Sequence, residues 1–228
     1  QPLSTKICTI GGMIETNASD SRDIKYGRTS NFILGIELVN GNGEILKLGK
    51  ADLGDVAGLE GITGVIVKAK LKLVDKKKRK TSIFKTDNAF KAVDFARKLK
   101  LDKNVSRIEF YDKLTSSLLG LEDKYHILVE FENGEASEEK EKHVNLRERV
   151  YSVLASLGYV DLEDFKIFLD KFSESVELLE KLKIPFFADL GSGIIHPVFL
   201  DEQKEMIDRV LEYVKKMHGK VNGRFGIG

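Results

Sequence analysis

Two stretches near the carboxyl end of the chain contain the residue types that chemistry most often uses. DLGSGIIHP, residues 189–197, holds a carboxylate at Asp189 and an imidazole at His196, and GKVNGRFGIG, residues 219–228, holds a guanidinium at Arg224. Carboxylates and imidazoles can ligate metals, an imidazole exchanges its proton near neutral pH, and a guanidinium pairs with anions. The competing interpretation of His196 is a partly buried structural histidine in a His-Pro turn.

A glycine-rich stretch near the amino end has the composition of a ligand-binding loop. It reads GGMIETNASDSRDIKYG, residues 11–27, and its paired glycines, Gly11 and Gly12, place no side chain in the way of a ligand. The small polar run Thr16 to Ser19 favours turns with exposed backbone N–H groups, which can hold a phosphate or a flat polar ring. The same composition also occurs in ordinary surface loops.

A second cluster of glycines follows in ADLGDVAGLEGITGVI, residues 51–66. Glycines interrupt short apolar pieces here, and residues 65–73 then alternate apolar and charged side chains, as a half-buried strand does. A glycine-rich strand–turn–strand segment without any ligand would look the same. Each cluster alone is therefore a weak signal, and the two together in this order are a stronger one.

The two clusters resemble the FAD-linked oxidases of the vanillyl-alcohol oxidase type, which include D-lactate dehydrogenases, the glycolate oxidase flavin subunit and D-2-hydroxyglutarate dehydrogenases. There, the first cluster reads GG, a few residues, TNASGS, an Arg and Tyr-Gly, and the second reads roughly DLxxLFxGSEGTLGIIT. The chain departs from the family at Asp20, where Gly is usual, and at Ile62-Thr63, which reverses the usual order. The resemblance implies FAD as the cofactor, with flavin contacts from Gly11, Gly12, Thr16, Asn17, Ala18, Ser19, Tyr26, Glu60, Gly61, Gly64, Val65 and Ile66.

The resemblance also assigns roles to the two stretches near the carboxyl end. In relatives they read HAGDGNLHP and GxISGEHGIG; two His and the Glu hold a divalent metal in several members, and the last His is the proposed base. Here Asp189 and His196 stand at the first two metal positions, but Arg224 and Phe225 stand at the third and at the base. Arginine repels a cation and phenylalanine takes no proton. The metal site is therefore incomplete and a bound divalent metal doubtful, with Arg224 expected to bind the substrate carboxylate and His196 left as the catalytic candidate.

Composition narrows the class of protein. The chain has 228 residues with 37 basic and 36 acidic side chains, a balance that argues against nucleic-acid binding. Its single Cys8 excludes an internal disulfide, and no apolar run is long enough for a transmembrane helix. These features predict a cytoplasmic protein, or one at the periphery of a membrane, and the high lysine and glutamate content indicates a thermophile.

The basic run DKKKRK, residues 75–80, marks the expected domain boundary and is interpreted as a solvated linker rather than an anion-binding patch. Residues 1–77 are expected to form the second half of an FAD-binding α+β domain. The family's proline- and glycine-rich pyrophosphate loop would lie before Gln1, so the flavin affinity of the chain alone should be low. Residues 78–228 are expected to form a ferredoxin-like α+β cap domain, truncated at its carboxyl end, on the substrate side.

Periodicity predicts the elements that position these residues. A strand is expected at Thr5–Ile10 and a hairpin around Gly41-Asn42-Gly43. A helix that Asp87 or Asn88 caps should bury Phe90, Val93, Ala96 and Leu99. Further strands are expected at 81–85, 105–111, 126–132, 165–169 and in a pair around 191–193, and further helices at 114–119, 138–157, 173–182 and 201–217.

Three functions fit these observations. The first is an FAD-dependent oxidoreductase for a small D-2-hydroxy acid such as D-lactate or glycolate, working with an electron acceptor or an oxidase partner subunit. The second is a non-catalytic or altered subunit of such an oxidase, which Arg224 and Phe225 favour. The third is a binding or assembly module without flavin, which Asp20 and the missing upstream loop favour.

Overall fold

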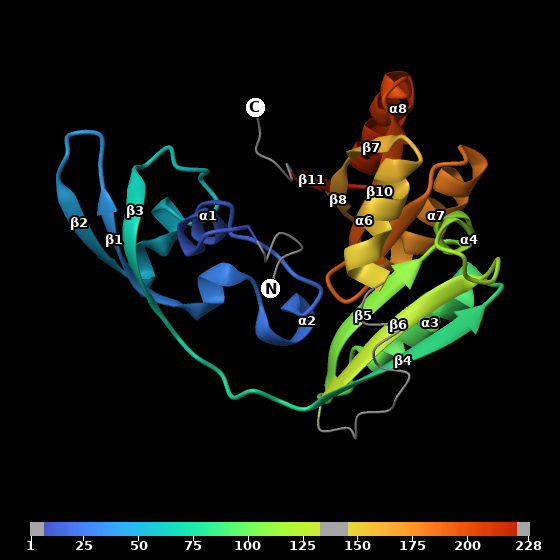
Figure 1. The fold of residues 1–228 in the computed structure, drawn as a ribbon, viewed down its shortest axis with the longest axis horizontal. Coiled ribbons are helices and arrows are strands. Elements are labelled where there is room, and N and C mark those ends of the chain that lie inside the picture. Colours follow the sequence, from blue (N-terminus) through green and yellow to red (C-terminus); the bar gives the residue numbers. More distant parts are fainter. Residues whose placement is uncertain (1–6, 133–145, 223–228) are drawn as a thin grey trace. The chain divides into compact units, whose positions relative to one another are not determined.

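The structure is a computed structural model that describes residues 7–132 and 146–222. These residues form two compact units, one up to Lys76 and one from Lys77 onward (Figure 1). The division falls inside the basic run, where the side chains of residues 75–78 are exposed.

Unit 1, the part up to Lys76, is a small antiparallel sheet packed against short helices. The sheet has the order β2-β1-β3. One buried cluster holds it together: Ile14, Ile33, Ile36, Leu38, Leu53 and Val56. Its elements are α1 (Ile10–Glu15), α2 (Asp23–Tyr26), η1 (Thr29–Phe32), β1 (Ile33–Val39), β2 (Ile45–Gly49), η2 (Lys50–Asp55) and β3 (Val65–Leu71).

The predicted hairpin between β1 and β2 is confirmed, and its turn has a clear local cause. The Asn40 side-chain oxygen accepts the N–H groups of Asn42 and Glu44 at 3.0 Å each. Gly43 has φ +80°, a conformation that favours glycine.

The strand predicted at Thr5–Ile10 is wrong in its described part, Ile7–Ile10. Ile10 begins helix α1 instead, because the Thr9 hydroxyl caps that helix by accepting the N–H of Gly12 at 3.0 Å. The paired glycines therefore lie in a helix rather than in an open loop. A single capping side chain outweighed the weak alternation of apolar residues.

Unit 2, from Lys77 onward, is a large antiparallel sheet with helices on both faces, as in an α+β fold. The strand order is β11-β8-β10-β9-β5-β6-β4, and β7 also pairs with β10. Its elements are β4 (Arg79–Thr86), α3 (Ala89–Leu99), β5 (Val105–Tyr111), α4 (Lys113–Leu118), β6 (Tyr125–Glu132), α6 (Leu146–Ser156), β7 (Tyr159–Leu162), β8 (Asp164–Lys166), η3 (Leu169–Lys171), α7 (Phe172–Lys181), β9 (Phe186–Asp189), β10 (Ile194–Leu200), α8 (Lys204–Lys216) and β11 (Lys220–Asn222).

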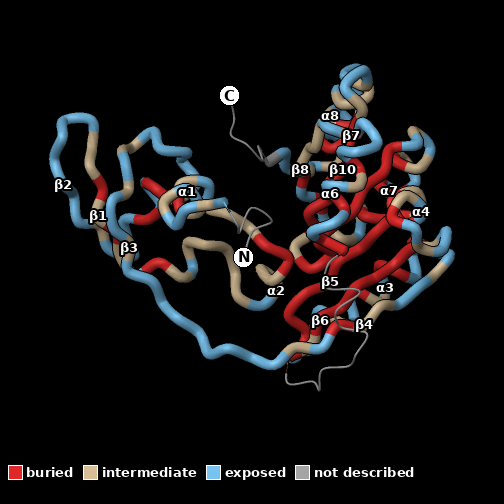
Figure 2. The backbone as a smooth tube through the Cα atoms, in the orientation of Figure 1, coloured by how far each residue is buried: buried red, intermediate tan, exposed pale blue. Residues whose placement is uncertain are grey.

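Apolar side chains bury both faces of the central strands, which Figure 2 shows as long buried runs. On one face, Leu146 and Val150 of α6 pack with Tyr111 and Phe187. On the other face, the ring of Phe110 lies 5.2 Å from that of Phe172 in α7, centroid to centroid. The predicted α+β fold class is thus confirmed.

Several predicted elements differ from the structure in detail. Helix α3 begins as expected, with the Asn88 side chain accepting the N–H of Lys91, but Phe90 is 60% exposed. Val93 and Ala96 are buried as predicted, and Ala89 and Ala92 complete the buried face in place of Phe90. The strand predicted at 165–169 ends at Lys166, β7 and β11 were not predicted, and residues 138–145 of the predicted long helix lie outside the described residues.

Asp112, between β5 and α4, joins the sheet to the helix. Its carboxylate accepts the N–H groups of Leu114 and Thr115 in the first turn of α4, and that of Phe186 in β9, each at 3.0 Å. Burial raises the pKa of Asp112 to about 6, although these hydrogen bonds oppose the rise.

We predict that Asp112 makes unit 2 less stable as the pH rises from 4 to 7. A folded-state pKa above the ordinary value of 3.8 means that its contribution is complete below pH 3.8 and is lost as the pH passes about 6. Urea unfolding of the wild type and of Asp112→Asn should therefore differ in pH dependence by about 3 kcal/mol, since one pKa unit is about 1.4 kcal/mol. Parallel pH profiles would contradict this.

We also predict that Gly64 cannot be replaced. Gly64 has φ +148°, and an added Cβ would lie 2.3 Å from the Val39 carbonyl oxygen. Gly64→Ala should lower the free energy of opening of β1 and β3 by about 2 kcal/mol or more, measured by amide hydrogen exchange. Gly54→Ala is the control, because an added Cβ there meets nothing within 4 Å. Equal exchange in both variants would refute the close contact.

Candidate functional site

In unit 1, the two glycine-rich stretches lie against each other, although they are far apart in sequence. The N–H of Gly58 donates to the Ile14 carbonyl at 3.2 Å, and the N–H of Glu60 donates to the Glu15 carbonyl at 2.9 Å. The Glu15 carboxylate also accepts the N–H of Gly61 at 2.8 Å. These three bonds fix the loop at residues 58–61 on the carboxyl end of α1.

The backbone of both stretches is in conformations that few residues adopt. Gly58 and Gly61 have φ +88° and +83°, and the non-glycine residues Asn17 and Glu60 have φ +43° and +55°. Positive φ in non-glycine residues is uncommon and is often found at ligand sites. An added Cβ at Gly61 would meet nothing within 4 Å, so the surface there is bare backbone.

The polar side chains predicted to hold the flavin are engaged inside unit 1. The Thr16 hydroxyl donates to the Gly12 carbonyl at 2.8 Å, and the Ser19 hydroxyl donates to the Asp23 carboxylate at 2.7 Å. The Asn17 side-chain oxygen accepts the N–H of Ser30 at 3.1 Å. These side chains shape the loop, so a ligand would meet mainly its backbone.

The other predicted flavin residues lie around the same loops. The Ala18 carbonyl accepts both the N–H and the hydroxyl of Thr29, and the Tyr26 ring lies 6.5 Å from that of Phe32. Ile66 packs against the buried cluster of unit 1, and an added Cβ at Gly11 would lie 3.7 Å from the Ile66 carbonyl oxygen. Val65 is 67% exposed.

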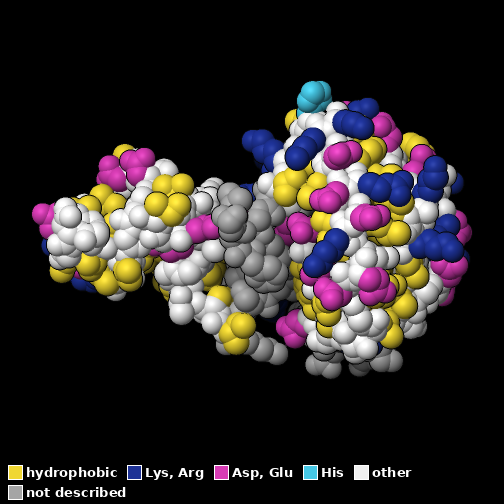
Figure 3. Space-filling model, turned by 90° about the horizontal axis from the view of Figure 1, so that it is seen from above, with side chains coloured by type: hydrophobic (Ala, Val, Ile, Leu, Met, Phe, Trp, Pro, Cys, Tyr) yellow, Lys and Arg dark blue, Asp and Glu magenta, His cyan; other side chains and the backbone are white. Residues whose placement is uncertain are grey.

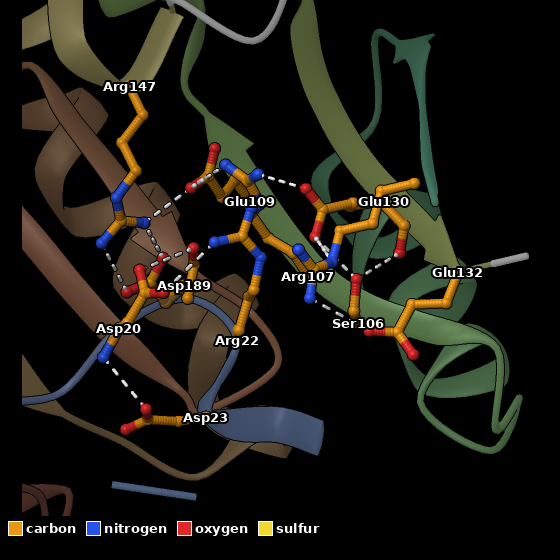
Figure 4. A network of polar contacts seen from close by, with 12 residues as sticks. Asp20, Arg22, Asp23, Ser106, Arg107, Glu109, Glu130, Glu132, Arg147 and Asp189 are labelled. Atoms are coloured by element: carbon orange, nitrogen blue, oxygen red, sulfur yellow. Dashed lines mark hydrogen bonds and ion pairs between the residues drawn. The ribbon is translucent and has the colours of Figure 1, made fainter. Parts of the chain in front are cut away.

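Asp20, which departs from the family pattern, is buried and has partners within unit 1. Its carboxylate accepts the Ser21 hydroxyl at 3.3 Å and lies 3.8 Å from the Arg22 guanidinium. Its N–H donates to the Asp23 carboxylate at 3.0 Å (Figure 4). The extra negative charge is thus partly balanced where it stands.

A small pocket lies near these loops. Its lining residues are Ser30, Asn31, Lys50 and Leu53, and its volume is about 300 Å³. The N–H of Ser30 is the group that binds the Asn17 side chain, so the pocket adjoins the turn at residues 16–19. The first glycine-rich stretch and this pocket therefore lie next to each other in unit 1.

In unit 2, the hairpin of β9 and β10 brings Asp189 and His196 together, as the sequence suggested. The Asp189 Oδ2 lies 3.5 Å from Nε2 of His196, and Asp164 in β8 holds the other ring nitrogen, Nδ1, at 2.6 Å. Burial lowers the pKa of His196, but the negative charges of Asp164 and Asp189 outweigh it and raise the pKa above its ordinary value. The imidazole therefore favours its protonated form.

Arg147, from α6, is the centre of this buried charged cluster. Its Nη1 atom lies 2.6 Å from Glu109 Oε1 and 2.6 Å from Asp189 Oδ1 (Figure 4). Burial raises the pKa of Asp189, but the guanidinium and His196 outweigh burial and hold it well below its ordinary value. The carboxylate stays charged because it has cations on two sides.

The charged cluster continues across the sheet as a row of alternating charge. Arg107 contacts Glu130 at 2.5 Å and Glu109 at 3.6 Å, and the Tyr111 hydroxyl donates to Glu109 at 3.0 Å. Arg79 lies 3.5 Å from Glu132 at the far end. Sequence reasoning missed this row, because charged residues in an alternating strand normally predict a solvent-facing side. Their repeated appearance in β5 and β6 was the available signal.

The predicted metal and substrate residues are only partly brought together. Among the residues that the structure describes, no group of three or more His, Cys, Asp and Glu side chains is placed to hold a metal ion. Arg224 and Phe225 lie outside the described residues.

Within the same described ranges, no helix has both the length and the apolar content to cross a membrane. Basic and acidic side chains are interspersed over the face of unit 2 in Figure 3.

Comparison with known proteins extends these observations. Residues 1–49 match the family model of the FAD binding domain. The chain is 27% identical to the glycolate oxidase subunit GlcD of Bacillus subtilis, over 100% of this chain and 61% of that protein. It is 29% identical to D-lactate dehydrogenase of Archaeoglobus fulgidus over 68% of this chain and 37% of that protein. It is 26% identical to mitochondrial D-2-hydroxyglutarate dehydrogenase of Rattus norvegicus over 97% of this chain and 53% of that protein.

A solved structure of alkyldihydroxyacetonephosphate synthase superposes on 96% of this chain and 54% of its own with a TM-score of 0.62. At 16% identity, this likeness concerns the fold alone. The chain spans 61% and 53% of the lengths of the relatives that cover nearly all of it. The resemblance to FAD-linked oxidases and the expectation of FAD are confirmed: residues 1–49, which include the first glycine-rich stretch, match the FAD binding domain, and the whole chain is similar to a glycolate oxidase subunit.

Proposed function

We propose that the chain is part of an FAD-dependent oxidoreductase that oxidises a small D-2-hydroxy acid such as D-lactate or glycolate. The observation that carries the proposal is the joining of the two glycine-rich stretches by three hydrogen bonds from the loop at residues 58–61 to Ile14 and Glu15. The names of the relatives, a glycolate oxidase subunit and D-lactate and D-2-hydroxyglutarate dehydrogenases, support the substrate class. A partner subunit or separate electron acceptor is part of the same proposal.

Each part of the chain has a separate role in this proposed reaction. FAD, when bound, supplies the acceptor for a hydride from the substrate C2. The bare backbone around Asn17 and Gly61 holds the flavin, and unit 2 forms the substrate side. His196, oriented by Asp164 at 2.6 Å, is the proposed proton-transfer residue, and Arg224 the proposed carboxylate-binding residue.

A second candidate is an altered subunit that keeps the fold without turnover. The contacts of His196 favour it, because both ring nitrogens face carboxylates and the pKa of the imidazole is raised. A general base must give up its proton before it can accept one. Phe225, which stands at the base position of the relatives, also favours an altered subunit, because a phenyl ring takes no proton.

We predict that Gly61→Ala weakens FAD binding at least tenfold, because the new methyl group covers bare backbone in the flavin loop. Gly43→Ala is the matched control: Gly43 has φ +80°, close to the +83° of Gly61, and an added Cβ meets nothing within 4 Å at either position. The measurement is titration with FAD followed by flavin absorption, on this chain and on a version extended upstream. Equal FAD affinities in the two variants would show that the loop at residues 58–61 does not contact the flavin.

Substrate reduction of the flavin separates the two candidates. We predict that D-2-hydroxy acids bleach the bound flavin under anaerobic conditions, whereas the L-enantiomers do not. His196→Asn should slow bleaching at least 100-fold with FAD affinity unchanged, in line with the typical contribution of general acid–base catalysis. Flavin that binds but is bleached by neither enantiomer of lactate, nor by glycolate or D-2-hydroxyglutarate, would establish the altered subunit.

A further inference from the structure

The pair of buried carboxylates at Glu109 and Asp189 needs a cation. The two residues are direct partners in the β5–β9 register, and they are 2% and 3% exposed. Two like charges side by side in a dry sheet are strongly unfavourable unless a cation lies between them. In a protein, that cation is a bound metal or a basic side chain.

Arg147 occupies the place between these carboxylates. Its Nη1 atom has one oxygen of each carboxylate at 2.6 Å, and its Nη2 atom lies 3.4 Å from the second oxygen of Asp189. Protein oxygens surround a calcium ion at about 2.3–2.6 Å, so the nitrogen stands where a hard cation would find two ligands. Both Asp189 oxygens already have a cationic partner.

The guanidinium is held in this place by the rest of α6. Leu146, next to Arg147, and Val150 and Leu154 further along the helix belong to the buried cluster of unit 2. The packed helix therefore fixes the backbone position from which the Arg147 side chain reaches the two carboxylates. His196, the other candidate metal ligand, also has partners on both ring nitrogens. Asp164 contacts its Nδ1, and Asp189 faces its Nε2.

We propose that Arg147 is a built-in cation that replaces a divalent metal at the Asp189–His196 site of this chain. The donor set does not fit a metal as it stands: binding one at Nε2 of His196 and Asp189 would bring a divalent charge beside the guanidinium. The inference rests on the proposed function for its catalytic meaning, but the charge arrangement itself needs no flavin. The place between Glu109 and Asp189 then holds the single charge of a guanidinium instead of the double charge of a divalent metal ion.

The test measures metal binding to the whole chain by dialysis against Mn²⁺ or Zn²⁺, followed by elemental analysis. The wild type should hold less than a tenth of an equivalent of either metal, and neither metal should shift its melting temperature. Arg147→Ala should bind Mn²⁺ or Zn²⁺ at least tenfold more tightly, because Glu109 and Asp189 lose their cation. That gain should disappear in the double variant with His196→Asn.

Arg107→Ala is the matched control, since it removes a second buried arginine of the same row but leaves Arg147 on Asp189. It should gain no metal. One equivalent of metal in the wild type that is lost in His196→Asn would overturn the proposal, as would no gain in a folded Arg147→Ala. If Arg147→Ala does not fold, the wild-type measurement still decides. Absence of FAD binding would defeat the proposed function and leave this result untouched.

Discussion

Unit 2 depends on the neutralisation of buried carboxylates by arginine. Glu109 and Asp189 face each other across β5 and β9, and Arg147 from α6 contacts both. Removing one member of such a buried group leaves an unpaired charge, which commonly costs about 3–5 kcal/mol. The same contacts therefore connect α6 to β5 and β9 and set the charge beside His196.

Unit 1 uses a different strategy, because it presents backbone rather than charged side chains. The loop is shaped by hydrogen bonds from the side chains of Thr16, Asn17 and Ser19. The Glu15 carboxylate attaches the second glycine-rich stretch to it by accepting the N–H of Gly61. The N–H groups of Gly58, Glu60 and Gly61 are donated within unit 1, so what the loop offers a flat ring is close approach to backbone without side chains. Unit 1 thus presents glycine-rich backbone, whereas unit 2 presents a buried cluster of charged side chains.

Local patterns predicted much of the fold. The Asn88 cap, the turn before Gly43 and the alternating strands β5 and β6 each have a cause within a few residues. Longer-range features were not predictable. Glu15 looked like an ordinary loop residue until its contact with Gly61, 46 residues away, was visible. Arg107 and Glu109 looked solvent-facing, because their burial depends on pairing with charges from other elements. The Asp189–His196 pair was expected from the resemblance to the family's motif, whereas its partners Asp164 and Arg147 were not.

Amide hydrogen exchange with and without FAD tests the central claim most directly, that the joined glycine-rich stretches hold the flavin. The account predicts that FAD slows exchange at residues 15–19 and 58–64, where the bare backbone lies. It predicts little change in β2, at the far edge of the same sheet. Bound flavin that leaves exchange at both stretches unchanged would show that these loops are structural and that the cofactor, if it binds, does so elsewhere.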